Sequence, residues 1–308
     1  MLIEYKNVEV FQETQEVLRD VTFSVDEGEF VYIIGKVGSG KSSLLKTLYG
    51  ELPIHEGEAY VMGYDMCGLR RKYLPELRRK LGVIFQDFQL LTDRTVDANL
   101  RFVLRATGWN NKVEIDERIN EVLTLVGMET KGYKLPSELS GGEQQRIAIA
   151  RAILNNPKII LADEPTGNLD AETSKLITEL LHKVVDEQGV TVVMITHNLR
   201  LVECYPGRVF ECKDKVFIEI NGLKKDIKKQ IAQIENNNDE NQEEDDFEII
   251  ENLTNLDTAG ELTDEVMGNL DEVEDNVEDK TDNDYKTTKQ TSLKPDLFEI
   301  LEDLVEVE

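Results

Sequence analysis

The 308-residue chain has little of what secreted, membrane-spanning or disulfide-stabilised proteins require. It has only three cysteines, Cys67, Cys204 and Cys212, which follow no CxxC or zinc-ligand spacing, so we expect free thiols in a reducing compartment. No charged-then-apolar leader opens the sequence, which predicts no secretory signal. Apolar runs such as Val190–Ile195 are far shorter than the roughly 18 residues of a membrane span. We therefore predict a cytoplasmic protein that contacts a membrane only through a partner.

Positive charge is also scarce, because 62 acidic residues face 35 basic ones and the net charge is -27. This balance argues against nucleic acid as a partner, since phosphate binding needs a basic face. The charge is unevenly distributed: residues 223–308 hold 28 acidic and 8 basic residues, a net of -20, which leaves -7 for residues 1–222. We place a domain boundary near residue 222.

Residues 1–222 have the pattern of an α/β domain. Short β-branched runs alternate with amphipathic segments, which favours a largely parallel sheet flanked by helices. The predicted parallel strands are Phe30–Ile34, Leu81–Phe85, Ile159–Asp163 and Val190–Ile195. The opening segments Leu2–Phe11 and Val17–Val25 are predicted to form an antiparallel edge pair.

The stretch of about 87–157 is almost wholly helical in pattern and is predicted to be a helical subdomain inserted into the α/β core. Its expected helices are Val96–Thr107, Glu114–Val126 and Gly141–Asn155.

The acidic segment 223–308 is predicted to be mostly disordered, because it holds too few apolar residues to offset the entropy of an ordered chain. An exception is Asp296–Glu308, where apolar residues recur at helical spacing: Leu297, Ile300, Leu301, Leu304 and Val305. This segment is either a fraying helix in a solvated tail or a short docking helix for a partner groove.

A glycine-rich loop follows the predicted strand Phe30–Ile34. Gly35–Ser42 fits GxxxxGK[ST] and precedes a predicted helix at Ser43–Tyr49, and this strand–loop–helix context separates a phosphate loop from a chance turn. Glycines let backbone N–H groups curl round phosphate oxygens, and the helix N-terminus favours the same anion. Lys41 is predicted to reach the β- and γ-phosphates and Ser42 to bind Mg²⁺. The predicted nucleotide contacts are Gly35, Gly38, Ser39, Gly40, Lys41, Ser42 and Ser43.

The apolar run that begins at Ile159 ends in two consecutive carboxylates, Asp163 and Glu164. Asp163 is predicted to bind Mg²⁺, which prefers oxygen ligands, and Glu164 to orient or deprotonate an attacking water. Alone, this pair is often only a solvated strand end; the phosphate loop beside it favours the catalytic interpretation.

A second anion site is predicted at Leu139–Arg146, whose sequence is LSGGEQQR. Ser140, Gly141 and Gly142 would begin a helix with free N–H groups and a hydroxyl. Because the chain already has a phosphate loop, a second phosphate-binding site suggests that this segment binds the nucleotide of another subunit.

LSGGEQQR resembles the signature of ATP-binding-cassette (ABC) ATPases, and the resemblance covers residues 1 to about 222, with the other motifs in order. It implies a P-loop NTPase core with an antiparallel β subdomain and an inserted helical subdomain. By this resemblance Gln86 contacts Mg²⁺ or water and senses a permease, and His197 contacts the γ-phosphate, although a lone histidine after a strand is more often structural. Asp170, in the loop Gly167–Asp170, lies in a segment that crosses a dimer interface and is predicted to contribute to nucleotide binding. Phe11 stacks on adenine, with a core phenylalanine as the alternative.

The family implies an ATPase that binds ATP and Mg²⁺ as a head-to-tail homodimer, in which each ATP lies between one phosphate loop and Ser140 and Gly142 of the other subunit. Residues Asp163–Asp170 are similar to the branch that contains FtsE-type, LolD-type and MacB-type ATPases. The Q-loop segment Phe85–Leu91 favours the FtsE type, which implies an FtsX-like permease and a place on the inner face of the membrane. Lipoprotein release, export, or a slow regulatory module that dimerises on ATP are the alternatives.

Overall fold

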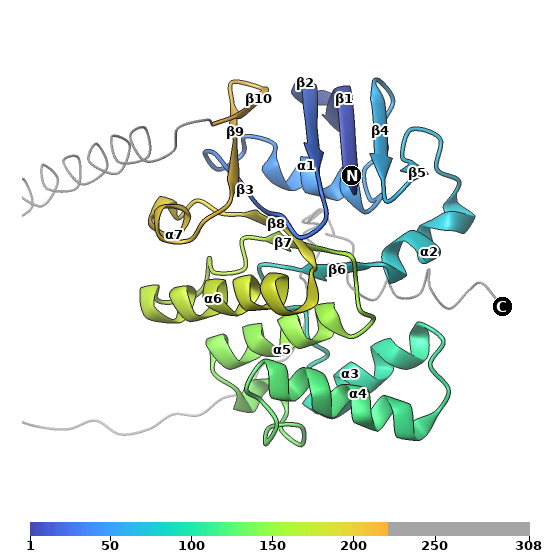
Figure 1. The fold of residues 1–308 in the computed structure, drawn as a ribbon, viewed down its shortest axis with the longest axis vertical. Helices are drawn as coiled ribbons and strands as arrows, with labels where there is room; N and C mark the ends of the chain where they lie inside the picture. Colours follow the sequence, from blue (N-terminus) through green and yellow to red (C-terminus); the bar gives the residue numbers. More distant parts are fainter. Residues whose placement is uncertain (221–308) are drawn as a thin grey trace, which may run out of the picture. The chain divides into compact units, whose positions relative to one another are not determined.

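The computed structural model describes residues 1–220. The predicted acidic segment 223–308, with Asp296–Glu308, lies outside the described residues. Within the described part the strands form one ten-stranded sheet, in the order β5-β4-β1-β2-β10-β9-β3-β8-β7-β6 (Figure 1). No helix among residues 1–220 is long and apolar enough to cross a membrane.

One half of the sheet is parallel. It contains β9 (Arg208–Lys213), β3 (Phe30–Ile34), β8 (Thr191–Ile195), β7 (Ile159–Asp163) and β6 (Leu81–Ile84). The central strands are apolar along almost their whole length and buried on both faces, as expected for a sheet covered on both sides. The predicted strands are present, and β6 ends one residue before Phe85. Strand β9 has a partly polar sequence and was not predicted.

The other half is antiparallel and contains the predicted pair as β1 (Ile3–Gln12) and β2 (Gln15–Val25). Two strands that were not predicted, β4 (Glu58–Val61) and β5 (Tyr64–Asp65), lie beyond β1 and form the edge itself. Strand β10 (Val216–Glu219) runs antiparallel to β9 and meets β2 through a single parallel pair, Val216 with Arg19. The two halves are therefore joined by few backbone hydrogen bonds, and side-chain packing holds them together.

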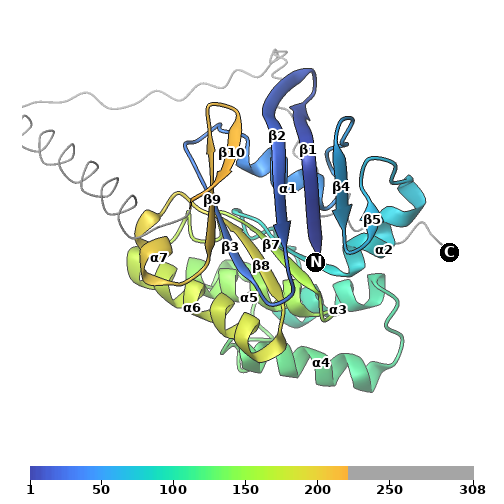
Figure 2. The ribbon, with the colours of Figure 1, turned by 45° about the horizontal axis from the view of Figure 1, so that its top comes forward.

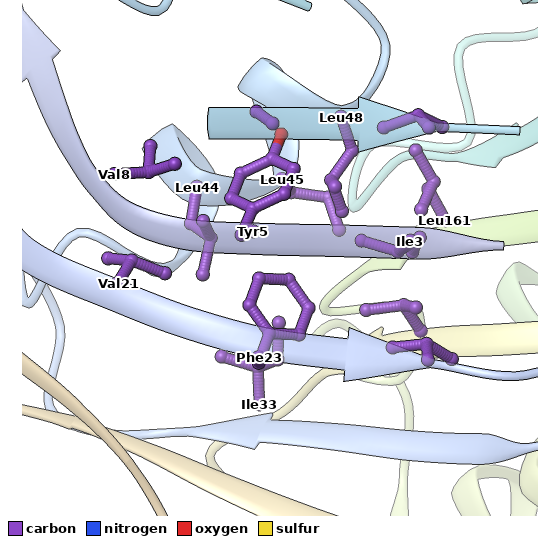
Figure 3. Close-up of a cluster of buried hydrophobic side chains, with 14 of the residues drawn as sticks. Ile3, Tyr5, Val8, Val21, Phe23, Ile33, Leu44, Leu45, Leu48 and Leu161 are labelled. Atoms are coloured by element: carbon purple, nitrogen blue, oxygen red, sulfur yellow. The ribbon is translucent and has the colours of Figure 1, made fainter. Parts of the chain in front are cut away.

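That packing centres on helix α1 (Lys41–Leu48), which starts directly after the glycine-rich loop. Figures 1 and 2 place α1 on the side of the parallel strands that faces β1 and β2, and α5 and α6 on the other side. In Figure 3 Tyr5 and Phe23 of the antiparallel half meet Leu44 and Leu48 of α1, all of them buried. The Tyr5 hydroxyl shares a 3.0 Å hydrogen bond with Thr47 Oγ1 on α1. The core thus fixes the helix that carries the end of the phosphate loop.

The remaining helices are α2 (Leu74–Arg79), α3 (Val96–Ala106), α4 (Lys112–Leu125), α5 (Gly141–Ile153), α6 (Ala171–Gln188) and α7 (Leu199–Cys204), with short 3₁₀ turns at Arg71–Tyr73 and Pro136–Glu138. Helices α3, α4 and α5 pack on one another, and α5 also contacts β6. Their ends lie within two residues of the predicted helical bounds.

Candidate active site

The predicted site residues gather where the parallel strands end at their carboxyl side. The phosphate loop follows β3, Gln86 follows β6, Glu164 follows β7 and His197 follows β8. Since β3, β8, β7 and β6 are neighbours in the sheet, these four loops share one edge, which is where open α/β sheets bind their ligands.

The phosphate loop is shaped by glycine at two positions that other residues could not fill. At Gly35, with φ of 145°, an added Cβ would lie 2.4 Å from the carbonyl oxygen of Cys212 and 2.8 Å from Ser39 Oγ. Gly40 has φ of 95° and turns the chain into α1, so the helix begins at Lys41 and not at Ser43 as predicted. The loop therefore has the curled backbone that the sequence motif requires.

Lys41 is the cation inside this loop. Its side chain is buried, and Nζ donates hydrogen bonds to the carbonyl oxygens of Gly35 at 2.8 Å and Lys36 at 2.9 Å. The hydroxyl of Ser39 is buried and has no hydrogen-bond partner among the described residues. A buried donor without a partner is unfavourable, so this hydroxyl is available to an incoming anion.

Ser42 and Asp163 provide oxygen ligands at the next position. Ser42 Oγ donates a 3.1 Å hydrogen bond to Asp163 Oδ1. Burial raises the pKa of the Asp163 carboxyl, the hydrogen bond from Ser42 acts in the opposite direction, and the charge of Glu164 raises it further. A hydroxyl beside a desolvated carboxylate fits a Mg²⁺ ion, which needs few protein ligands because it keeps waters and binds phosphate oxygens. Residues 1–220 hold no larger group of histidine, cysteine and carboxylate side chains suited to a metal.

Glu164 and His197 are brought together by the sheet. Asp163 and Ile195 are register partners in the parallel pair β7–β8, so the residues after them emerge side by side. Glu164 Oε2 lies 3.3 Å from His197 Nδ1, with Glu164 18% and His197 58% exposed. Glu164 also has a positive φ of 46°, unusual for a non-glycine residue, and its N–H donates to the carbonyl of Ile195 at 3.1 Å. The two side chains that were predicted to be catalytic therefore lie next to each other.

Gln86 is exposed at the end of β6 and lies against the loop after Glu164. Its carbonyl oxygen accepts a 3.1 Å hydrogen bond from Asn168 Nδ2. A Cβ built on Gly167 would lie 3.3 Å from Gln86 Nε2, so the side chain itself lies over this loop. Asn168 had been assigned no separate role from the sequence, and the structure shows that it links the two loops.

Ser140 begins helix α5 with a capping box. Its Oγ accepts from the Glu143 N–H at 3.3 Å, and Glu143 Oε2 accepts from the Ser140 N–H at 2.9 Å. This backbone hydrogen bond lowers the pKa of Glu143, and the ion pair with Lys131 lowers it further. The N-terminus of α5 is thus ordered in the single chain.

The signature glycines pack on the segment after Glu164. A Cβ on Gly142 would lie 2.6 Å from Thr173 Cγ2, and one on Gly141 would lie 3.4 Å from Leu169 Cδ2. In this chain, therefore, Gly141 and Gly142 lie against the start of α6.

Asp170 caps helix α6. Its Oδ1 accepts from the N–H groups of Glu172 and Thr173, and its Oδ2 accepts from Thr173 Oγ1 at 2.6 Å. The hydrogen bond from the Thr173 hydroxyl is the main reason that the pKa of Asp170 is lowered. The predicted nucleotide role of Asp170 would add to this structural role within its own chain.

Phe11 lies near the end of β1, opposite Glu16 of β2. It is partly exposed and is not part of the buried hydrophobic cluster. Stacking of Phe11 on adenine therefore stays a prediction, with packing at the margin of the core as its alternative.

Two buried polar residues near the site were not found from the sequence. Asn99 on α3 donates to the carbonyl oxygens of Leu91, Arg94 and Thr95 and accepts from the Leu91 N–H at 2.7 Å. Arg151 on α5 donates to backbone carbonyls of the segment after Gln86. For Asn99 the available signal was a polar residue on the apolar face of a predicted helix.

Comparison with known proteins gives consistent matches. A family model described as "ABC transporter" matches residues 18–167. The cell division ATP-binding protein FtsE of Streptococcus pneumoniae serotype 2 is 48% identical over 192 residues, which are 62% of this chain and 83% of the relative. FtsE of Bacillus subtilis strain 168 is 40% identical over 218 residues, 70% of this chain and 95% of the relative.

A solved structure shares the fold. The ATP-binding cassette MJ0796, a dimer in a post-hydrolysis state bound to ADP and Pi, aligns with a TM-score of 0.62 and 35% identity over 71% of this chain and 99% of its own.

Proposed function

The chain belongs to the ABC transporter family and is an ATPase, and on that premise we propose that it is the FtsE-like subunit of a membrane complex that acts in cell division. Its partner in this proposal is an integral membrane permease of the FtsX type. The observation that carries the proposal is the 40% identity over 95% of the length of the B. subtilis FtsE protein. It is supported by the predicted residues of the phosphate loop, Gln86, Glu164 and His197, which follow neighbouring strands at one sheet edge.

ATP binding begins at Lys41. We propose that its ammonium exchanges the carbonyl oxygens of Gly35 and Lys36 for β- and γ-phosphate oxygens. The free hydroxyl of Ser39, the backbone N–H groups from Gly38 to Ser43 and the positive end of α1 would bind the same anion. The partly exposed side chain of Phe11 is proposed to stack on the adenine.

Magnesium would be held by the Ser42 hydroxyl and the Asp163 carboxylate, with Gln86 beside them. When bound, the ion would neutralise phosphate charge and compensate the desolvated carboxylate of Asp163.

Hydrolysis is proposed to depend on Glu164, which accepts a proton from, or orients, the water that attacks the γ-phosphate. The nearby imidazole of His197 holds this carboxylate in place, at 3.3 Å in the present structure. The strained backbone at Glu164, fixed by the carbonyl of Ile195, restricts the direction of the side chain further. Catalysis is then mainly positioning and charge stabilisation.

A homodimer is proposed because the aligned cassette MJ0796 is dimeric. In an isologous pair, the anion site at Ser140, Gly141 and Gly142 of one subunit would cover the nucleotide on the phosphate loop of the other. Asp170 is linked to this interface through Thr173, which packs on Gly142 and donates a hydrogen bond to the Asp170 carboxylate. A movement of Gly142 at the interface would therefore also move Asp170. Attachment to the permease places the dimer on the inner face of the membrane.

The test is capture of the membrane partner in the ATP-bound state. Glu164→Gln in the full chain, with ATP, is purified from detergent-solubilised membranes and its companions are identified by mass spectrometry. Glu117→Gln, an exposed change on α4, is the matched control, and Lys41→Ala tests dependence on ATP. An FtsX-like permease enriched only with Glu164→Gln supports the proposal. A lipoprotein-release or export permease, or no membrane protein, would contradict the cell-division assignment and leave the ATPase assignment intact.

A further inference from the structure

Arg151 is a buried cation that touches the segment following Gln86. It lies in the last turn of α5 and is 6% exposed. Its NH2 donates to the carbonyl oxygen of Phe88 at 2.9 Å, and its NH1 donates to the carbonyl oxygen of Gln89. The guanidinium therefore binds two consecutive backbone carbonyls with its planar fork.

The backbone that Arg151 binds has an unfavourable conformation. Phe88 and Gln89 are consecutive non-glycine residues with positive φ, 59° and 47°. Such residues persist only where the surroundings hold them, and they concentrate at functional segments. The two hydrogen bonds from Arg151 are contacts that hold this turn from outside its own loop.

The same turn also contacts the start of α5. The Cζ atom of Phe88 lies 3.8 Å from a Cβ built on Gly141, in the first turn of the helix. Phe88 thus meets α5 twice, through its ring near Gly141 and through its carbonyl at Arg151. A movement of the helix that carries Ser140 would move Phe88 with it, because packed and hydrogen-bonded elements shift as units.

The charge of Arg151 strengthens this attachment. Among residues 1–220 its hydrogen bonds run to these two carbonyl oxygens, with no carboxylate partner. Burial lowers the pKa of Arg151 to about 10, so the group stays charged at neutral pH. A buried charge must be satisfied, and leaving these carbonyls would be costly.

We propose that Arg151 is a positioning residue for ATP hydrolysis, which fixes the segment Gln86–Gln89 to helix α5 so that Gln86 and the residues Ser140–Gly142 move as one unit. This rests on the proposed role of Gln86 at the nucleotide. Arg151 itself touches neither substrate nor magnesium in this proposal. It acts through the backbone of Gln86–Gln89, which connects it to the Gln86 side chain.

The first test is Arg151→Met in the full-length chain, assayed for ATP hydrolysis. We expect kcat to fall about tenfold or more, because a displaced positioning group is costly even far from the reacting atoms. KM for ATP should change less than about twofold, because the phosphate loop is untouched. Arg151→Lys, which keeps the charge and loses the fork, should retain an intermediate kcat.

The matched control is Arg118→Met. Arg118 is also buried, and it donates to the carbonyl oxygens of Leu154 at 2.9 Å and Ile153 at 2.5 Å, at the end of the same helix. Its hydrogen bonds and its 2.7 Å ion pair with Glu121 do not reach Gln86–Gln89. Its loss should therefore lower the thermal midpoint as much as Arg151→Met while leaving kcat near wild type. Equal loss of kcat in both variants would reduce Arg151 to a stabilising residue and overturn the proposal.

A double-mutant cycle with Gln86→Ala tests whether Arg151 acts through Gln86. If it does, the double variant should have the kcat of Gln86→Ala alone. If instead the fold-losses in kcat of the two single variants multiply in the double variant, the proposal is overturned. Wild-type kcat in Gln86→Ala would instead contradict the proposed role of Gln86, and so separates failure of the proposed function from failure of this inference.

Discussion

Glu164 Oε2 and His197 Nδ1 lie 3.3 Å apart, although the two residues follow different strands and are separated by helix α6 in the sequence. The parallel register that pairs Asp163 with Ile195 produces this contact. The carboxylate proposed to orient water thus lies beside a side chain from the loop after the neighbouring strand.

This contact predicts the effect of His197→Ala. Binding of ATP should persist, and kcat should fall about a hundredfold, because the carboxylate loses the group that orients it. In combination with Glu164→Gln the loss should not multiply, since the two residues act as a unit. His55→Ala, another exposed histidine, is the control. Steady-state ATPase rates measure the effect, and an additive double variant would contradict it.

Asp163 predicts an unusual dependence of stability on pH. Its pKa is raised mainly by burial, so the ionised form costs stability in the folded chain. Asp163→Asn should therefore raise the free energy of unfolding at pH 7 to 8 in the absence of nucleotide and magnesium. For a raised pKa the cost is absent below the ordinary aspartate value and complete above the folded value, so the gain from Asn should shrink as the pH falls through the folded pKa.

Denaturant unfolding from neutral pH down towards the ordinary aspartate pKa measures this difference. Asp93→Asn, at an exposed site, is the control and should change stability little at any pH. A destabilised Asp163→Asn variant at neutral pH would mean that the carboxylate is better compensated than its burial implies. The variant should also lose the magnesium dependence of ATP binding.

Gly142 predicts a specific steric rescue. In Gly142→Ala the new Cβ would lie 2.6 Å from Thr173 Cγ2, and Thr173 cannot turn away without breaking its hydrogen bond to Asp170. Overpacking of this kind costs about 1–3 kcal/mol. Thr173→Ser removes Cγ2 and keeps the hydroxyl, so it should restore most of the loss. Gly141→Ala, with 3.4 Å to its nearest neighbour, should be tolerated.

Thermal or chemical unfolding of the nucleotide-free chain measures this series, because the catalytic roles of the glycines do not enter it. Equal destabilisation by Gly141→Ala and Gly142→Ala, or no rescue by Thr173→Ser, would contradict the packing described.

The sequence was sufficient for the parts of the fold with strong local signals. The apolar runs at β3 and β7 predicted buried strands, and the motif at Gly35–Ser42 predicted a loop whose tight geometry at Gly35 the structure confirms. Asp170 was assigned a role only at the dimer interface and the nucleotide, although an aspartate before an amphipathic segment is a helix N-cap signal. That local rule would have found its capping role.

Contacts that depend on register or on long side chains could not be derived from one sequence. The meeting of Glu164 with His197 needs the alignment of β7 and β8, which apolar runs do not specify. Arg151 looks like an ordinary surface arginine in sequence, because an extended side chain from the last turn of a helix can reach solvent or carbonyls equally well. Strand β10 was missed because only Phe217 of its residues is buried.

The most direct test of the account is ATP hydrolysis by purified full-length Glu164→Gln, measured beside Glu117→Gln and with bound nucleotide quantified at the same time. The account predicts that Glu164→Gln retains ATP and loses about a hundredfold or more in turnover, because the group that handles the water is gone. Glu117→Gln should match the wild type. Near-normal turnover by Glu164→Gln would contradict the assignment of Glu164, and with it the mechanism built on its contact with His197.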